Sequence, residues 1–213
     1  MAVYTKITNK EIISISNSYK LDKIIKFTGI KKGIENTNYL LRTRKKKLIL
    51  TIFEKRINKK DLPFFMNLMD RLNQKNILCP KPLKDKKGQH LNKIKGKSAC
   101  IVSFLEGKDK AKLNNKNCFE IGKNIAKFHK AANKIKLYRR NSMSVTQLDS
   151  LLKSIKIKSS KIDSGIVPIL YKNLKDIKKE WPKNLPSGII HGDLFIDNIF
   201  FIKNNFSGFI DFY

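Results

Sequence analysis

The sequence is poor in cysteine and in acidic residues, and it contains no long apolar run. Its three cysteines lack the paired spacing of a zinc site and the density of a disulfide framework, so we expect buried, reduced thiols. No apolar stretch approaches the ~20 residues of a membrane-spanning helix, and the N-terminus lacks the charged-then-apolar order of a secretory signal. These absences indicate a cytoplasmic protein.

Acidic residues are outnumbered by basic ones, 17 against 46, which gives a formal net charge of +29. A basic surface can bind nucleic acid by neutralising phosphates. Here, however, the lysines are spread over nearly every segment, and isoleucine and asparagine, which share A/T-rich codons with lysine, are also abundant. We therefore interpret the charge as genome composition on a solvated surface and do not expect nucleic-acid binding as the main function. The sequence gives no indication of the oligomeric state.

Apolar residues make up 41% of the chain, enough for a core, and their patterns predict an α+β protein in two parts. The first part, residues 1–106, is expected to be a nucleotide-binding lobe built on an antiparallel sheet. Its helices begin at Thr8 and at Asp61, each of which is a candidate cap. Its strands are expected over residues 24–30, 38–43, 47–54, 89–95 and 98–105.

The second part, residues 107–213, is predicted to be mainly helical. Its helices are expected over residues 117–132, 145–157 and 167–181. A short strand over 188–190 should then lead into a loop, and a hairpin should pair 199–202 with 207–211. A sheet with one embedded helix, followed by helices, a loop and a hairpin, is the layout of a two-lobed protein-kinase-like fold.

The loop from His191 to Asn198 fits the kinase pattern His-x-Asp-Leu-x-x-x-Asn. In this pattern the aspartate handles the proton of the acceptor hydroxyl, and the asparagine binds Mg²⁺. We therefore assign Asp193 as the catalytic residue and Asn198 as a metal ligand. A solvated turn can carry the same letters, but the predicted hairpin returns Asp211 beside Asn198 as a second metal ligand. That return favours phosphoryl transfer.

Two neighbours in this loop have other roles. We expect His191 to brace the loop by hydrogen bonding rather than to touch a substrate. Asp197 is equally compatible with a loop cap and with a metal ligand.

Two segments of the first part are candidates for binding ATP. The stretch from Gly29 to Leu40 is placed to bring backbone N–H groups to the phosphates, although an ordinary hairpin turn has the same glycines. Residues 101–107 are the candidate hinge against the adenine edge, and this reading is compatible with a simple buried strand and turn. The expected nucleotide-binding residues in these segments are Gly33, Asn36, Thr37, Asn38, Ser103, Phe104 and Leu105.

One feature of protein kinases is missing. Their third strand carries a lysine that contacts the phosphates and pairs with a glutamate on the next helix. The matching strand position here is Thr51, and the helix offers Phe65 or Met66. Lys55 or Arg56, just beyond the strand, is our candidate for the missing positive charge.

With these elements the chain resembles bacterial homoserine kinases, whose fold is similar to that of aminoglycoside phosphotransferases and choline kinases. The catalytic loop is shared by that whole superfamily, whereas the run Glu35-Asn36-Thr37-Asn38-Tyr39 and the strand Leu50–Arg56 look specific to homoserine kinases. The resemblance covers the full length and includes residues 1–5, 33–39, 50–56, 61–65, 103–107, 191–195 and 210–213.

The resemblance implies ATP-dependent phosphorylation of L-homoserine to O-phospho-L-homoserine in threonine biosynthesis, with Mg²⁺ as cofactor. Two alternatives remain open: a kinase for another hydroxylated amine such as choline or an aminoglycoside, and a non-catalytic kinase-like binding module. Family members continue for about a hundred further residues in helices. We therefore expect a truncated chain with uncovered apolar faces, weak stability and poor or absent turnover.

Overall fold

A computed structural model describes residues 3–33, 35–55, 57–160 and 165–213 of the chain. Met1, Ala2, Ile34 and Arg56, which enter the sequence predictions, lie outside the described residues. The chain forms two compact units, one of Met1–Leu137 with Gly188–Tyr213 and the other of Tyr138–Ser187. These units divide the chain elsewhere than between residues 106 and 107. The predicted lobe boundary stays a prediction, because a lobe and a compact unit are different groupings.

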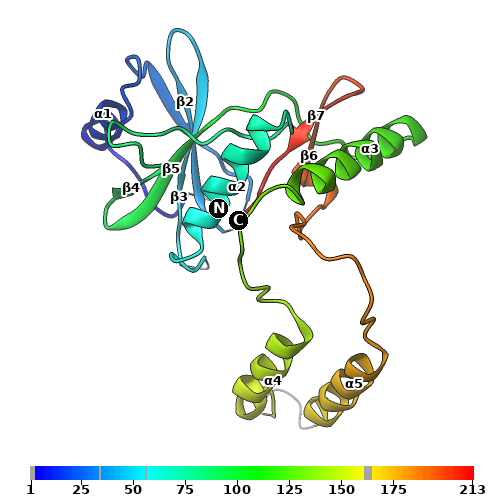
Figure 1. The fold of residues 1–213 in the computed structure, drawn as a ribbon. Helices are drawn as coiled ribbons and strands as arrows, with labels where there is room; N and C mark the ends of the chain where they lie inside the picture. The colour runs from blue at the N-terminus through cyan, green and yellow to red at the C-terminus, as the bar shows by residue number, and fades with distance from the viewer. Residues whose placement is uncertain (1–2, 34, 56, 161–164) are drawn as a thin grey trace. The chain divides into compact units, whose positions relative to one another are not determined.

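The first unit contains a five-stranded antiparallel sheet in the order β1-β2-β3-β5-β4 (Figure 1). All five predicted strands are present, with somewhat shifted bounds, and α2 (Leu62–Gln74) is inserted between the third and the fourth. The strands are β1 Lys26–Gly29, β2 Thr37–Arg42, β3 Lys47–Ile52, β4 Leu91–Ile94 and β5 Lys97–Ser103.

Both faces of this sheet are covered, and β3 shows how its sequence achieves this. Leu48, Leu50 and Ile52 share one face, where α1 (Asn9–Ser18) packs Ile12 and Ile15 against them. Because successive strand side chains point to opposite faces, Ile49 and Thr51 face the other side. The second core lies there and joins α2, α3 (Asn115–Ala132) and the C-terminal hairpin through Met66, Leu72, Phe128, Phe201 and Phe209.

The two predicted caps differ in outcome. Thr8 caps α1 in a reciprocal capping box with Glu11, as predicted. Asp61 stands at the N-cap position of α2, as predicted, but its side chain makes no capping bond. The reason is geometric, because Asp61 already has helical angles (φ −87°, ψ −18°), whereas a capping residue is normally extended.

The predicted C-terminal hairpin is present as β6 (Ile199–Ile202) and β7 (Asn205–Phe209), joined through Lys203 and Asn204. Lys108 and Phe201 exchange two backbone hydrogen bonds of 3.0 and 2.9 Å, which tie the hairpin to the segment after β5. The strand predicted over 188–190 was wrong. Ile190 is 64% exposed, and no strand of the described residues pairs with this segment.

The second unit is a pair of helices, α4 (Val145–Ser160) and α5 (Ile166–Glu180), close to the two predicted helices. Leu152, Val167 and Leu174 are its buried apolar residues among those described. Lys178 Nζ of α5 lies 2.8 Å from Asp149 Oδ1 of α4, so the two helices are also joined by an ion pair.

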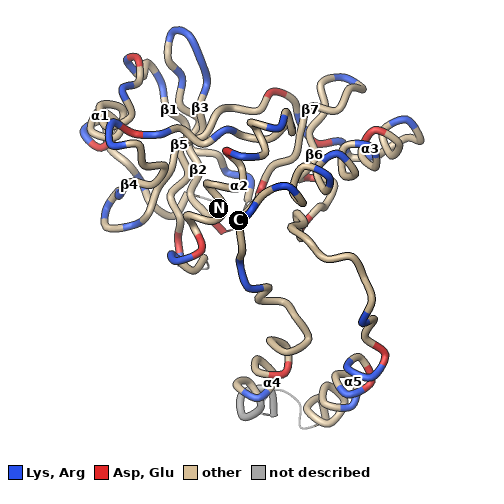
Figure 2. Tube along the Cα trace, viewed as in Figure 1, with Lys and Arg blue, Asp and Glu red and all other residues tan. Residues whose placement is uncertain are grey.

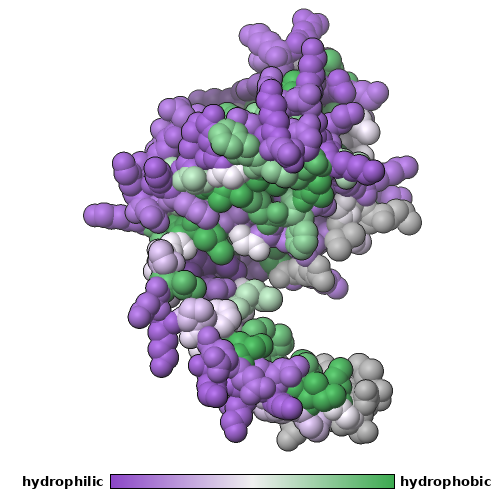
Figure 3. All heavy atoms as spheres, turned by 90° about the vertical axis from the view of Figure 1, so that its right-hand side faces the viewer, coloured by the Kyte–Doolittle hydropathy of each residue, from purple (hydrophilic) through white to green (hydrophobic). Residues whose placement is uncertain are grey.

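Basic residues are dispersed over the chain, as the sequence indicates. Lys and Arg are scattered over almost every element (Figure 2). Figure 3 also shows apolar side chains gathered on the face of the first unit where α3 and the hairpin lie. Phe119 of α3 and Phe195 before β6 are each 68% exposed.

Cys79 and Cys100 are buried as predicted, but Cys118 is exposed, because the residues that α3 buries are Asn117, Phe128 and Ala132.

Through the described parts of the chain, no helix combines the length and the apolar character that crossing a bilayer requires.

Candidate active site

The loop before β6 brings Asp193 and Asn198 together. A one-turn 3-10 helix (Ile196–Asn198) turns the chain so that Asn198 is buried, while Asp193 stays exposed. Asn198 Nδ2 donates to the backbone oxygen of Asp193 at 2.8 Å and to its Oδ2 at 3.2 Å. These bonds orient the Asp193 carboxylate. They use the amide nitrogen of Asn198 and leave its amide oxygen as the atom that can bind a cation.

The hairpin returns Asp211 to the same place. The N–H of Ile210 donates to the backbone oxygen of Asn198 at 3.0 Å, so Asp211 directly follows a residue that is bonded to the loop. Burial of the carboxyl group raises the pKa of Asp211 to about 6, and the nearby carboxylates of Glu35, Asp193 and Asp197 act in the same direction. The Asp211 side chain nevertheless keeps access to solvent. It is a crowded carboxylate, but one that a ligand can reach.

The donors suit Mg²⁺, which prefers carboxylate and carbonyl oxygens together with water. Asp193, Asp197 and Asp211 form no ion pair with any described lysine or arginine, so a divalent cation would offset their mutual repulsion. Within the described ranges, no three His, Cys, Asp or Glu side chains converge as a complete metal site. Asn198 and Asp211 would therefore hold the ion together with water or substrate oxygens.

His191 braces this arrangement. Its Nε2 lies 2.8 Å from the backbone oxygen of Ile210, and a carbonyl can only accept, so Nε2 carries the proton. Burial lowers the pKa of His191, which keeps the ring neutral near pH 7. Its Nδ1 is buried without a hydrogen-bond partner among the described residues. This geometry fits the bracing role expected from the sequence, since the bonded carbonyl directly precedes Asp211.

In the candidate phosphate loop, Gly33 is exposed, whereas Asn36 and Thr37 are buried. Gly33 is exposed, has a φ of 100°, and has no atom within 4 Å of where a Cβ would lie. Asn36 and Thr37 are buried instead, at 7% and 0% exposure. The Thr37 hydroxyl accepts from the N–H groups of Tyr4 and Thr5 and donates to Glu54. Its hydrogen-bonding capacity is therefore filled by the protein, so this side chain supports the loop.

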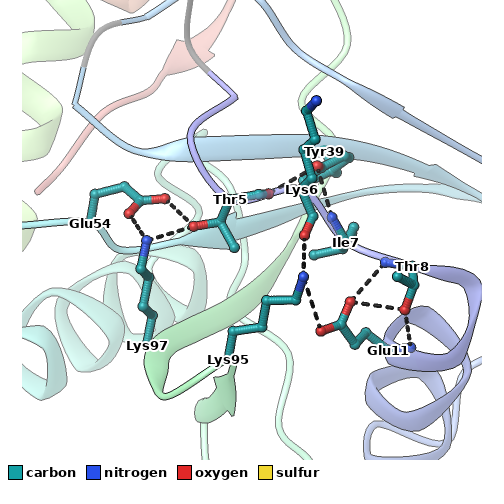
Figure 4. Close-up of polar contacts among 9 residues, drawn as sticks. All are labelled: Thr5, Lys6, Ile7, Thr8, Glu11, Tyr39, Glu54, Lys95 and Lys97. Carbon is teal, nitrogen blue, oxygen red and sulfur yellow. Dashed lines mark hydrogen bonds and ion pairs between the residues drawn. The ribbon is translucent and has the colours of Figure 1, made fainter.

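Glu54 is the centre of that support (Figure 4). Its carboxylate accepts from the hydroxyls of Thr5 and Thr37, both at 2.7 Å, and pairs with Lys97 of β5. Its backbone N–H donates to Asn36 Oδ1 at 3.4 Å. The N-terminal segment, the phosphate loop and the end of β3 therefore meet at one carboxylate, although they are separate in the sequence.

Three residues of the candidate hinge contact neighbouring elements. The Ser103 hydroxyl accepts from the N–H of Lys81 at 2.8 Å, and Lys47 Nζ lies 4.9 Å from the centre of the Phe104 ring. Leu105 is half-buried and lies against Gly208 of β7. Phe104 and Leu105 are thus partly accessible apolar side chains next to a backbone turn, which is compatible with contact to an adenine ring.

The two candidates for the missing positive charge have different outcomes. Lys55 is exposed just past the end of β3. Arg56 lies outside the described residues. Thr51 is completely buried, so the matching strand position cannot offer a group to a nucleotide.

The sequence predictions named Glu35 only as part of the family resemblance and did not assign it to the site. Its carboxylate is close enough to Asp211 to raise the pKa of that group, although 176 positions separate them in the numbering. One signal was available, because Glu35 stands in the candidate phosphate loop of a chain that has only 17 acidic residues.

Solved structures with the same fold are phosphotransferases. A choline kinase from Cryptosporidium parvum matches 96% of this chain and 64% of its own, with a TM-score of 0.68 at 16% identity. A spectinomycin phosphotransferase solved with ADP and spectinomycin matches 98% of this chain and 69% of its own, with a TM-score of 0.64 at 12% identity. The predicted two-lobed, kinase-like α+β fold is therefore confirmed.

Sequence relatives are closer. The chain is 40% identical to the homoserine kinases of Agrobacterium fabrum and Rhizobium meliloti and 37% identical to that of Methylobacterium radiotolerans, in each case over all 213 residues. It spans 65 to 66% of the length of these relatives. The model of the phosphotransferase enzyme family matches residues 26–213, which include the sheet, the loop and the hairpin. The chain therefore belongs to the phosphotransferase enzyme family.

Proposed function

We propose that this protein transfers the γ-phosphoryl group of ATP to the hydroxyl of L-homoserine and so forms O-phospho-L-homoserine for threonine biosynthesis. The observation that carries the proposal is the 37–40% identity over the whole chain to proteins named homoserine kinase. Because the chain spans about two thirds of those relatives, the activity of the whole protein is part of the proposal.

The chemistry is assigned to the residues that the loop and hairpin bring together. Asp193 takes the proton of the acceptor hydroxyl as that oxygen attacks the γ-phosphorus, and the bond to the β,γ-bridging oxygen breaks. The Asn198 amide supports this role, since it donates to the Asp193 carboxylate and limits its rotation. Asn198 and Asp211 would hold Mg²⁺, which supplies charge neutralisation on the phosphate oxygens.

The nucleotide is assigned to the first unit's sheet. Solved structures with this fold contain ADP or AMP, which supports nucleotide use here. Gly33 allows close backbone approach to the phosphates, and Asn36, Thr37 and Asn38 shape that loop. Ser103, Phe104 and Leu105 are the proposed adenine contacts. We also keep the cytoplasm as the proposed compartment, because Cys79, Cys100 and Cys118 are all free thiols.

Lys55 is our proposed source of positive charge for the phosphates. Replacing Lys55 by Ala should raise the KM for ATP about three- to tenfold without changing the KM for the acceptor, because a single charge-assisted contact is lost. Steady-state kinetics with ATP varied at saturating acceptor measures this. Lys59→Ala is the matched control, since Lys59 is also exposed close to the end of β3. An unchanged KM for ATP in Lys55→Ala contradicts the assignment.

The test of the activity itself is ADP release with a panel of acceptors: L-homoserine, choline, an aminoglycoside and water. It should be run on this chain and on a version extended by the C-terminal third of the Agrobacterium fabrum relative. Turnover with homoserine alone supports the proposal. Turnover with another acceptor supports the second kinase reading, and absence of turnover in both versions supports a non-catalytic module.

Asp193→Asn then separates chemistry from binding. It should lower turnover about 10²- to 10⁴-fold and leave Mg²⁺·ADP binding in place, because it removes a proton acceptor and no metal ligand. Asp22→Asn, at an exposed carboxylate outside the site, is the control and should leave both unchanged. Full turnover in Asp193→Asn would exclude the assigned role.

A further inference from the structure

Thr51 stands at the strand position that carries the lysine in protein kinases, but it cannot contact the phosphates as that lysine does. Its side chain is 0% exposed and faces α2, and its Oγ1 lies 2.8 Å from Asn38 Oδ1 on β2. An amide oxygen only accepts, so the Thr51 hydroxyl donates its one proton to Asn38. Thr51 is thereby bonded to a residue of the candidate nucleotide loop while being shut away from the nucleotide itself.

Tyr213 completes the contact from the other end of the chain. Its hydroxyl lies 3.2 Å from Thr51 Oγ1. Since Thr51 gives its only proton to Asn38, Tyr213 must be the donor in this pair. The result is a chain of two hydrogen bonds, from Tyr213 to Thr51 and from Thr51 to Asn38, which we call the relay.

The Tyr213 ring also contacts the elements that hold the ion pair in kinases. It packs edge-on against Phe53, just past β3, with ring centres 5.0 Å apart, and against Phe65 of α2 at 6.4 Å. Phe65 is one of the two helix residues that stand where the glutamate is expected. The strand, the helix and the segment that follows β7 are therefore joined through one tyrosine.

Asp211, two residues earlier, has a backbone that needs such support. Its φ of 63° lies in the left-handed region, which is unfavourable for residues with a side chain. On its N-terminal side, Ile210 is bonded to Asn198 and His191. On its C-terminal side, Phe212 packs against the His191 ring at 4.7 Å, and Tyr213 is bonded to the sheet. The carboxylate is thus fixed from both sides.

We propose that Tyr213 is a positioning residue that holds Asp211 in its metal-binding conformation and joins it, through Thr51, to Asn38 of the nucleotide loop. This relay takes over the coupling that the lysine and glutamate provide in protein kinases. The inference rests on the proposed Mg²⁺·nucleotide function of the site.

Tyr213→Phe tests it, because this change removes the hydroxyl and keeps the ring. Tyr19→Phe is the matched control. Tyr19 is buried in the core on the opposite face of the same sheet, and its hydroxyl is also hydrogen-bonded, to the backbone oxygen of His90 at 2.7 Å, but it takes no part in the relay. Thr51→Val breaks the relay at its middle.

The measurement is calorimetric binding of ADP with Mg²⁺ and with EDTA. Tyr213→Phe should weaken Mg²⁺·ADP binding about two- to tenfold and change metal-free ADP binding by less than about twofold, as expected for one lost hydrogen bond. Thr51→Val should behave like Tyr213→Phe, and the double variant should lose little more than either, because both changes break one relay. Tyr19→Phe should leave both affinities unchanged.

A second measurement does not depend on a ligand. Amide hydrogen exchange of residues 210–213 should be faster in Tyr213→Phe and in Thr51→Val than in Tyr19→Phe. Equal exchange in all three variants overturns the proposal, as does a Tyr213→Phe variant that weakens ADP binding equally with and without Mg²⁺. A wild-type protein that binds ADP no better with Mg²⁺ overturns the proposed function, and with it the role given to Tyr213.

Discussion

Individual carboxylates in this protein have opposite environments, although the chain has few of them. Burial, together with the like charges of Glu35, Asp193 and Asp197, raises the pKa of Asp211 to about 6. Glu54 is surrounded by donors, and its pKa is lowered. The first arrangement resists ionisation and suits a cation site, whereas the second favours ionisation and stabilises the fold. The two groups therefore respond differently to acid.

Glu54→Gln should destabilise the protein near neutral pH. Burial alone would raise the pKa of Glu54, but hydrogen bonds from Lys97, Thr5 and Thr37 outweigh it, so the folded-state pKa lies below the ordinary 4.5. The stabilisation is then complete above pH 4.5 and is lost as the pH falls through the folded-state pKa. We expect a loss of about 1–2 kcal/mol at neutral pH, reduced because Lys97 is partly exposed.

Urea unfolding at about pH 7 and about pH 3 measures this prediction, and the difference from wild type should shrink at the lower pH. Glu106→Gln is the control, because Glu106 also pairs with a lysine, Lys47 at 2.8 Å, but is 60% exposed. It should change the unfolding free energy by less than about 0.5 kcal/mol. An equal loss for Glu54→Gln at both pH values would argue against a charge effect.

Among the elements, the C-terminal hairpin depends on a close approach of two backbones. Gly107 has a φ of 113°, and a Cβ added there would lie 2.7 Å from the backbone oxygen of Phe201 in β6. This approach lets Lys108 pair with Phe201 and lets the Ser207 hydroxyl donate to the backbone oxygen of Glu106. The hairpin that carries Asp211 is thus attached directly to the segment that follows the hinge.

Gly107→Ala should therefore cost about 2–4 kcal/mol of stability, since it combines an unfavourable φ with a backbone clash. Gly96→Ala is a matched control, because Gly96 also has a positive φ, 74°, but has no atom within 4 Å of the added Cβ. It should cost only about 1 kcal/mol. Chemical denaturation compares the two. Similar losses at both positions would mean that the contact with Phe201 adds nothing beyond backbone strain.

At the scale of the whole molecule, the dominant property is the net charge of +29. Lys and Arg are distributed over both units instead of forming one patch (Figure 2). Such a surface repels itself in the folded state, and the repulsion is screened by salt over about 10 Å at 0.1 M. We therefore expect the net charge to lower the stability of the fold, and we do not connect it with a particular binding partner.

Raising NaCl from about 0.05 to about 0.5 M should raise the Tm by several degrees, because screening reduces repulsion more in the compact state than in the unfolded chain. Thermal unfolding followed by circular dichroism is the measurement, and KCl should produce the same shift as NaCl. A constant or falling Tm would show that local ion pairs, such as that of Asp149 with Lys178, outweigh the net repulsion.

The sequence by itself determined the order of elements and pointed to the candidate site residues. Strand and helix periodicities are local, so all five sheet strands, the helices and the hairpin could be predicted, apart from a strand over 188–190 that has no pairing partner. The contact between Asp193 and Asn198 could be expected for the same reason, because their spacing is short.

Only the tertiary structure decided how distant residues are combined. The sequence could not show that Glu54 holds Thr5 and Thr37, that Glu35 lies close enough to Asp211 to raise its pKa, or that Tyr213 reaches Thr51 across 162 positions. It also could not show that Asp61 fails as a cap, which depends on its backbone angles. These outcomes depend on sheet register, on which face each side chain occupies and on the return of the hairpin, and none of these is encoded within a short window of sequence.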